Sequence, residues 1–171
     1  MNRRQSGYSL IEILVVVAII GIISLVTVPN FISLQRSAKI KSSMRNFVSD
    51  IRTMRQRAVT RHTPTKLSFT TGTATTARDY SLWEWDATAT PPAWTQIGPT
   101  KRLEEACYIV SKTNFNDVDG DGTWDIVFKT DGTPLLAAGV FQATAVLKTD
   151  WNIPTTQYTI TVVISGSVRT S

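Results

Sequence analysis

The segment 117–125 contains the residues whose types and spacing are best suited to chemistry. It reads Asp-Val-Asp-Gly-Asp-Gly-Thr-Trp-Asp, with carboxylates at relative positions 1, 3, 5 and 9 and a glycine at position 6. Acidic oxygens arranged in this way around a glycine turn form an oxygen cage suited to Ca²⁺. Four carboxylates so close together repel one another unless a cation lies between them. We therefore predict a structural Ca²⁺ ion with the ligands Asp117, Asp119, Asp121, Asp125 and the backbone carbonyl of Thr123.

The residues around this segment leave one alternative open and exclude another. An EF-hand is excluded because position 12 is Phe128 instead of glutamate and because the sequence after the loop reads as a strand. An ordinary acidic turn without an ion stays open. The segment resembles the calcium loops that lie between strands in FG-GAP-type and thrombospondin-type repeats. This resemblance implies an ion that stabilises the fold and takes no part in catalysis.

The other reactive side chains exclude several classes of enzyme and metal site. The chain has one cysteine, Cys107, and one histidine, His62. A single cysteine excludes an intramolecular disulfide and a zinc site built from several cysteines. No set of acid, base and nucleophile is visible in the sequence. We expect Cys107 to be buried, His62 to lie near the helix end, and the protein not to be an enzyme.

The N-terminal region is distinguished by a long apolar run. Residues 13–28 carry no charged side chain, and an extension to 10–34 reaches the length of about 20 residues that a helix needs to cross a bilayer. Glu12 lies at the start of this run, where a carboxylate in hydrocarbon is costly and requires a role. A secretory signal peptide is disfavoured because 29–33 has no small-residue cleavage site. A plain signal anchor leaves Glu12 unexplained.

Residues 7–22 read Gly-Tyr-Ser-Leu-Ile-Glu-Ile-Leu-Val-Val-Val-Ala-Ile-Ile-Gly-Ile and closely resemble the class III leader of type IV pilins and type II secretion pseudopilins. The resemblance implies cleavage by a prepilin peptidase between Gly7 and Tyr8, followed by methylation of the new amino group of Tyr8. Tyr8 stands where phenylalanine is usual. The resemblance also implies that the carboxylate of Glu12 meets the N-terminal ammonium of a neighbouring subunit during assembly. Two charges paired in this way compensate each other in an apolar medium.

Helical periodicity continues beyond the apolar run. Apolar residues recur at spacings of three and four at Met44, Phe47, Val48, Ile51, Met54 and Ala58. This pattern predicts the apolar face of an amphipathic helix. We therefore expect one helix from near Leu10 to about Arg61, in which Pro29 permits a bend. Its first half would lie in a membrane or a filament core, and its second half would pack against a globular head.

Basic residues follow the other faces of the second half of this helix, at Arg36, Lys39, Lys41, Arg45, Arg52, Arg55, Arg57 and Arg61. They form either a solvated face or one that makes salt bridges to other subunits, or else a face that binds the phosphates of nucleic acid or lipid. The candidate DNA contacts are Arg52, Arg55 and Arg169. Arg169 ends the segment Gly-Ser-Val-Arg, which carries only the second arginine of the Gly-Arg-x-Arg ending of some DNA-uptake pilins. The formal net charge of +5 permits nucleic acid as a partner but does not favour it.

From residue 65 onward, the alternation of apolar and polar residues is typical of strands. Strands are predicted at 66–70, 80–85, 94–97, 108–110, 124–129, 140–147 and 158–164. No helical segment separates them, so they should pair antiparallel. The predicted fold class is α+β, with a long N-terminal helix, transmembrane in its first half and amphipathic in its second, packed on an antiparallel β-sheet head. The predicted divisions are a cleaved leader at 1–7, a membrane or filament-core segment at 8–34, an amphipathic segment at 35–62 and the head at 63–171.

The order of a long helix followed by a strand-rich head is similar to the GspH/FimT-like branch of the pilin family. This resemblance implies a minor pilin or pseudopilin of a type II secretion pseudopilus or a type IV pilus. It implies one pass through the inner membrane, with the head on the periplasmic or outer side. The implied partners are other pilin or pseudopilin subunits, the prepilin peptidase, the inner-membrane assembly platform and membrane lipid. The main structural subunit of a filament and a DNA-binding minor pilin for DNA uptake stay open as alternatives.

Overall fold

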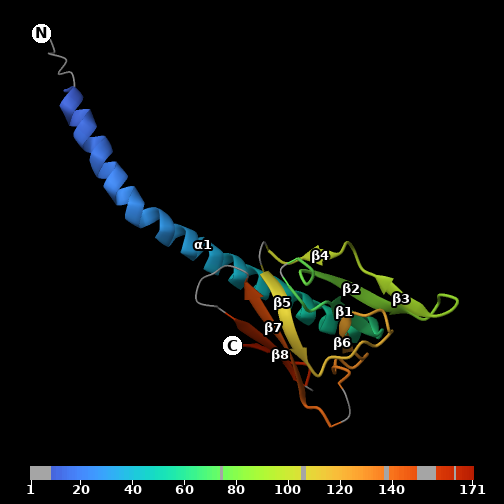
Figure 1. Ribbon diagram of the computed structural model, residues 1–171. Helices are drawn as coiled ribbons and strands as arrows, with labels where there is room; N and C mark the ends of the chain where they lie inside the picture. The colour runs from blue at the N-terminus through green and yellow to red at the C-terminus, as the bar shows by residue number, and fades with distance from the viewer. Residues whose placement is uncertain (1–8, 74, 105–106, 137–138, 150–156, 164) are drawn as a thin grey trace, which may run out of the picture. The chain divides into compact units, whose positions relative to one another are not determined.

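The computed structural model describes residues 9–73, 75–104, 107–136, 139–149, 157–163 and 165–171 (Figure 1). The chain divides into two compact units, an N-terminal unit, Met1–Ser37, and a C-terminal unit, Ala38–Ser171. One helix, α1, spans Leu10–Arg61 and therefore belongs to both units. It ends before His62, whose φ of 52° is a left-handed conformation that commonly terminates helices. The predicted helix and the predicted place of His62 are both confirmed.

The part of α1 in the N-terminal unit exposes its apolar side chains. The large aliphatic and aromatic residues described between Leu10 and Leu34 are 41–81% exposed. Among the described residues, no helix has a segment that is both long enough and apolar enough to span a membrane. The transmembrane assignment of the first half of α1 therefore stays a prediction.

The first sheet of the C-terminal unit contains β1 (Thr65–Phe69), β2 (Asp79–Asp86), β3 (Ala93–Gln96), β4 (Lys101–Arg102) and β6 (Trp124–Phe128). The strand order is β3-β2-β1-β6, and β4 pairs with the beginning of β2 beyond the end of β3. All of these pairs are antiparallel. Side chains alternate between the two faces of a strand. Leu67 and Phe69 of β1 therefore lie on one face of the sheet, and Lys66 and Ser68 lie on the other.

The second sheet contains β5 (Cys107–Thr113), β7 (Gln142–Thr149), β8 (Tyr158–Val163) and β9 (Val168–Thr170), in the order β5-β7-β8-β9. Its pairs are also antiparallel, with a register shift between Ile109 and Ser111. The predicted α+β class and antiparallel pairing are thus confirmed, and the strands are divided between two sheets. β4 and β9 were not predicted, because two or three residues are too few to establish an alternating pattern.

The core of the C-terminal unit forms around the amphipathic part of α1. Phe47, Ile51, Met54 and Ala58 are at most 1% exposed, which confirms the predicted apolar face. The ring of Phe47 contacts Tyr80 edge to face, with centroids 5.0 Å apart. Residues of the second sheet, including Ile109, Leu147 and Ile160, belong to the same cluster. Burial of each large side chain stabilises the unit by about 1.5–3 kcal/mol. Because residues of both sheets belong to the same cluster as this helix face, the two sheets share one core.

Candidate functional site

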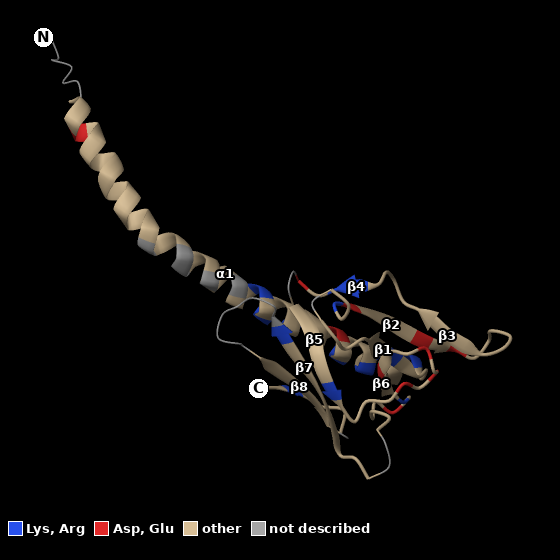
Figure 2. Cartoon of the chain, viewed as in Figure 1, with Lys and Arg blue, Asp and Glu red and all other residues tan. Residues whose placement is uncertain are grey.

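The acidic loop, residues 117–125, precedes β6 and includes the first two residues of that strand. Gly120 and Gly122 adopt φ values of 78° and 83°, which a residue with a side chain rarely adopts. Asp117 accepts hydrogen bonds from the backbone N–H groups of both glycines, at 2.7 and 2.9 Å. The loop brings carboxylate oxygens of Asp117, Asp119 and Asp125 within 4.8 Å of one another. Figure 2 shows acidic residues along this loop, in red.

Asp121 and Asp125 differ in their surroundings. Asp121 accepts hydrogen bonds from the backbone N–H and the hydroxyl of Thr123, at 2.8 and 2.6 Å, and these bonds, above all that from the hydroxyl, lower the pKa of Asp121. Asp125 is buried and accepts hydrogen bonds from the Ser68 hydroxyl at 2.5 Å and from the Val118 backbone N–H at 3.0 Å. Burial raises the pKa of Asp125. The structure thus gathers three of the four predicted carboxylates, while Asp121 fixes its own turn.

Lys66 supplies a cation to this cluster, which sequence reasoning missed. Its side chain is 1% exposed, and its Nζ lies 2.5 Å from Asp119 Oδ2 and 3.5 Å from Asp125 Oδ1. Nζ also lies over the rings of Trp83 and Trp94, at 5.5 and 5.4 Å from their centroids. The alternation with Leu67 predicts that Lys66 lies on the opposite face of β1 from the core. Only the folded loop reveals that this face is covered.

The cluster of Asp117, Asp119 and Asp125 has some, but not all, of the features of a site for a hard cation such as Ca²⁺. Three converging carboxylates are the donor set that Ca²⁺ prefers, and the glycine turn and the backbone bonds to Asp117 hold the loop in shape without an ion. The Lys66 ammonium already compensates one of the three charges and lies at the oxygen of Asp119. An ion held by Asp117, Asp119 and Asp125 would therefore share Asp119 with Lys66 or displace its ammonium.

The predicted processing and assembly residues lie at the start of the chain. Gly7 and Tyr8 fall outside the described residues. Glu12 lies in the first turn of α1 and, with Ile13, Val16 and Val17, lines a shallow depression of about 280 Å³ on the helix surface. It is the one acidic residue between positions 9 and 37, and Figure 2 draws most of this part of α1 in tan, the colour of uncharged residues. The structure thus places a lone carboxylate on an exposed aliphatic surface.

The arginines proposed as DNA contacts are divided by the structure. Arg55 donates from Nε to the carbonyl of Gly132 and from Nη2 to the carbonyl of Ser165, both at 3.0 Å. Arg52 donates from Nη2 to the carbonyl of Val168 at 3.4 Å. The guanidinium of Arg55 therefore holds two turns against α1, and that of Arg52 contacts the first residue of β9. Arg169, on β9, is exposed.

Two further arginines of the same helix are engaged with one carboxylate. Arg57 forms two hydrogen bonds to Glu84, at 3.1 and 2.8 Å, and Arg61 lies 3.4 Å from the same oxygen. The hydrogen bond from Arg57 is the main reason that the pKa of Glu84 is lowered, and the Thr63 hydroxyl contributes as well. Four arginines of the basic face of α1 thus bind strands or turns of the chain itself.

Three further titratable groups contribute to the packing of the C-terminal unit. Cys107 is buried, as predicted, and burial raises the pKa of its thiol, which disfavours the reactive thiolate. Asp50 of α1 accepts hydrogen bonds from the Tyr80 hydroxyl at 2.7 Å and from Lys101 Nζ at 2.6 Å. Lys112 Nζ lies 3.3 Å from the ring centroid of Trp124. Each contact ties a charged group to the packing of the C-terminal unit.

Comparison of the sequence with known proteins gives a match to a family motif and a match to one related protein. Residues 2–28 match the prokaryotic N-terminal methylation motif. A stretch of 45 residues is 44% identical to the type IV major pilin protein PilA of Myxococcus xanthus (strain DK1622), covering 26% of this chain. The match spans a fifth of the length of that relative, 20%.

The fold is similar to that of the minor pseudopilin EpsH from the type 2 secretion system of Vibrio cholerae. The TM-score is 0.58 at 12% sequence identity, over 78% of this chain and 96% of that one. At this identity the likeness concerns the fold alone, an N-terminal helix with antiparallel sheets. The methylation motif, the local similarity to a pilin and this shared fold together support a place for the chain in the family of type IV pilins and pseudopilins.

Proposed function

We propose that the chain is a minor pilin or pseudopilin of the GspH/FimT type, a non-enzymatic subunit of a type II secretion pseudopilus or a type IV pilus. The observation that carries this proposal is the combination of Glu12 and an exposed aliphatic surface in one half of α1 with a strand-rich core around the other half. Aliphatic surface of this extent is unfavourable in water and requires cover by lipid or protein. The fold likeness to a minor pseudopilin supports the minor-subunit form of the proposal.

The proposed location before assembly is the inner membrane, with a single pass of α1 and the C-terminal unit on the periplasmic or outer side. The hydroxyls of Ser24 and Thr27 support this location because they donate to the carbonyls of Ile20 and Ile23, at 2.7 and 2.9 Å. A hydroxyl that is bonded within its own helix costs less in hydrocarbon than a free one. Membrane lipid and the inner-membrane assembly platform are the partners of this stage.

Processing and assembly follow from the same segment. We propose that the prepilin peptidase cleaves between Gly7 and Tyr8, that the amino group of Tyr8 is methylated, and that Glu12 pairs with the N-terminal ammonium of a neighbouring pilin or pseudopilin subunit. Within the N-terminal unit, Glu12 lies among aliphatic side chains. An unpaired carboxylate in such surroundings is costly, and a partner ammonium removes much of this cost.

The proposal extends to a structural Ca²⁺ ion in the acidic loop. Asp117, Asp119 and Asp125 would hold it through their clustered oxygens, and Asp121 and the carbonyl of Thr123 would complete the ligand set after a rotation of Asp121 away from the Thr123 hydroxyl. The ion would supply positive charge to the loop and stabilise the folded state over the unfolded state.

One alternative is favoured by a specific observation. The 45-residue similarity to a major pilin favours a role as the main building block of a filament. DNA uptake lacks such support, because Arg52 and Arg55 donate to carbonyls within the chain and leave Arg169 as the exposed candidate.

Quantitative mass spectrometry of sheared filaments and of whole membranes tests the proposal. A mature N-terminus at methylated Tyr8 and trace amounts of the chain in filaments are the expected results. An intact Met1 in the membrane fraction would contradict the processing step. Dominance of the chain among filament proteins would replace the minor-subunit reading with the main structural subunit.

A further inference from the structure

Three indole side chains gather on the face of the first sheet that is turned away from α1. Trp83 and Trp85 belong to β2, and Trp94 of β3 pairs directly with Trp85. The rings of Trp85 and Trp94 meet edge to face, with centroids 5.3 Å apart. These indoles, with Pro92, Val118 and Asp119, line a groove of about 690 Å³. We call it the indole groove.

The indole groove is accessible from outside the molecule. β3 is the edge strand of the first sheet, and the three tryptophans are only half-buried. Val118, at the wall formed by the acidic loop, is 41% exposed. Tryptophan is the residue most enriched at the energetic centres of protein interfaces. The groove is therefore shaped to receive a side chain from another molecule.

The charge around the groove selects a cationic occupant. Segment 117–125 carries four carboxylates and no basic residue, and the Lys66 ammonium that contacts them offsets one charge. The loop, of which Asp119 lines the groove, thus retains a formal charge of −3, or −1 when the proposed Ca²⁺ ion is bound, and this charge repels anions. The electron-rich faces of indoles attract cations as well. A planar guanidinium satisfies both features, because it stacks on aromatic rings and donates to carboxylates.

We propose that the indole groove binds an arginine side chain presented by a neighbouring subunit of the filament. This inference rests on the proposed function, since it takes the neighbour to be another pilin or pseudopilin. Lys66 lies on the sheet side of the groove, where its ammonium is placed over the rings of Trp83 and Trp94. The groove is then an interaction surface of the C-terminal unit, separate from the assembly contact of Glu12.

NMR of the full chain in detergent micelles tests the binding chemistry. The probes are the tripeptide acetyl-Gly-Arg-Gly-amide and its uncharged analogue with citrulline in place of arginine. The arginine peptide is expected to shift the indole N–H signals of Trp83, Trp85 and Trp94 and to leave that of Trp124 in place. The citrulline peptide should bind about tenfold more weakly, because the cationic contribution of about 1.4 kcal/mol is lost. Equal binding of both peptides, or shifts produced only by a neutral oligosaccharide such as chitotetraose, would overturn the inference.

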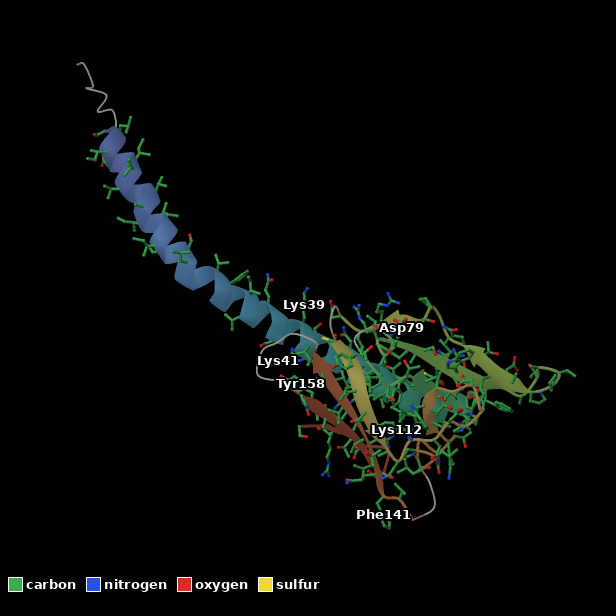
Figure 3. All side chains as sticks on the ribbon, in the orientation of Figure 1. Lys39, Lys41, Asp79, Lys112, Phe141 and Tyr158 are labelled. Atoms are coloured by element: carbon green, nitrogen blue, oxygen red, sulfur yellow. The ribbon has the colours of Figure 1, made fainter. Side chains whose placement is uncertain are left out.

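Photo-crosslinking in cells identifies the occupant. A benzoylphenylalanine in place of Val118 should crosslink, within the sheared filament fraction, to an arginine-containing segment of another subunit. The same group at Phe141, which is 71% exposed at a distant loop (Figure 3), is the matched control and should not capture that segment. If the chain is found in filaments but Val118 captures no such segment, the inference fails and the proposed function stands. If the chain is absent from filaments and is found unprocessed in membranes, the proposed function fails. The NMR result then still decides whether the groove binds arginine.

Discussion

The ammonium of Lys66 lies 2.5 Å from a carboxylate oxygen of Asp119, beneath the acidic loop of the C-terminal unit. A lysine with 1% exposure is rare unless it is paired. The pair joins β1 to a loop more than fifty residues further along the chain, and Asp125 lies 3.5 Å away as a second carboxylate. The loop is therefore held to the sheet by an internal cation, and any metal ion bound at Asp119 has to share this carboxylate with the ammonium or displace it.

Replacement of Lys66 tests this internal cation. Lys66→Met should lower the free energy of unfolding in EGTA by about 3–5 kcal/mol, because it leaves buried carboxylate charge without its partner. Urea unfolding of the full chain in micelles measures the change. Lys129→Met, at an exposed lysine next to β6, should change stability by no more than about 0.5 kcal/mol. A Lys66→Met variant as stable as the wild type would show that the ion pair contributes no net stability.

Calcium should raise the melting temperature of the chain. An ion that binds only the folded state stabilises it by about 2.7 kcal/mol at a concentration a hundredfold above its dissociation constant. Differential scanning calorimetry in millimolar Ca²⁺ and in EGTA provides the measurement. Asp119→Ala should abolish the shift, and Asp131→Ala should preserve it, because Asp131 bonds to Thr133 in a separate turn. No shift in the wild type would contradict the metal site.

Lys66 and Ca²⁺ should also compete. If the ammonium of Lys66 shares Asp119 with the ion, removal of that ammonium frees an oxygen and a negative charge for the metal. Isothermal titration calorimetry should therefore give a lower calcium dissociation constant for Lys66→Met than for the wild type. An unchanged constant, with binding intact, would place the ion away from Asp119.

Gly166 should not tolerate a side chain. Its φ is 76°, and a β-carbon there would collide with Arg55 Nε and lie 2.5 Å from the carbonyl oxygen of Gly132. Gly166→Ala should cost more than about 2 kcal/mol, because strain and a displaced guanidinium add together. Gly98→Ala is the matched control, since Gly98 has a φ of 72° but open space around it; its cost should be about 1 kcal/mol. Equal costs for both variants, measured by urea unfolding, would exclude a role for the Arg55 contact.

Glu84 should govern part of the loss of stability in acid. The Arg57 guanidinium holds the pKa of Glu84 below its ordinary value of 4.5. A lowered pKa in the folded state contributes stability above the unfolded-state pKa, and this contribution is lost as the pH falls through the folded-state value. Glu84→Gln should therefore be less stable at neutral pH and lose less stability between about pH 5 and the acid limit. An unchanged pH profile of stability in Glu84→Gln would contradict this role.

Glu12 should be needed for assembly but not for membrane association. Glu12→Ala removes the charge that would pair with a neighbouring N-terminal ammonium, so incorporation into filaments should fall several-fold while the membrane fraction stays constant. Immunoblots of sheared filaments and membranes measure both. Leu14→Ala, at a neighbouring exposed aliphatic residue, should assemble nearly as the wild type does. Normal incorporation of Glu12→Ala would rule out the pairing role.

Local periodicity in the sequence was sufficient for the elements of the fold. The spacing of Phe47, Ile51, Met54 and Ala58 predicted both the helix and its buried face, because residues three and four apart share one side of a helix. Alternation predicted seven of the strands, and the absence of intervening helices predicted their antiparallel pairing. The acidic loop was also evident, because its carboxylates and glycines are neighbours in the chain.

Tertiary structure alone decided which side chains these elements bring together. The division into two sheets, the cover over Lys66 and the capture of two carbonyls by Arg55 all join residues between about fifty and more than a hundred positions apart. Such contacts depend on the packing of distant segments, which no local pattern encodes. For this reason the sequence left open whether Arg52 and Arg55 contact solvent, other subunits or DNA, whereas in the folded chain they donate to the carbonyls of Val168 and Gly132. Lys66 was not recognised from the sequence either, although its buried ammonium offsets one negative charge of the acidic loop and lies over two indole rings of the groove.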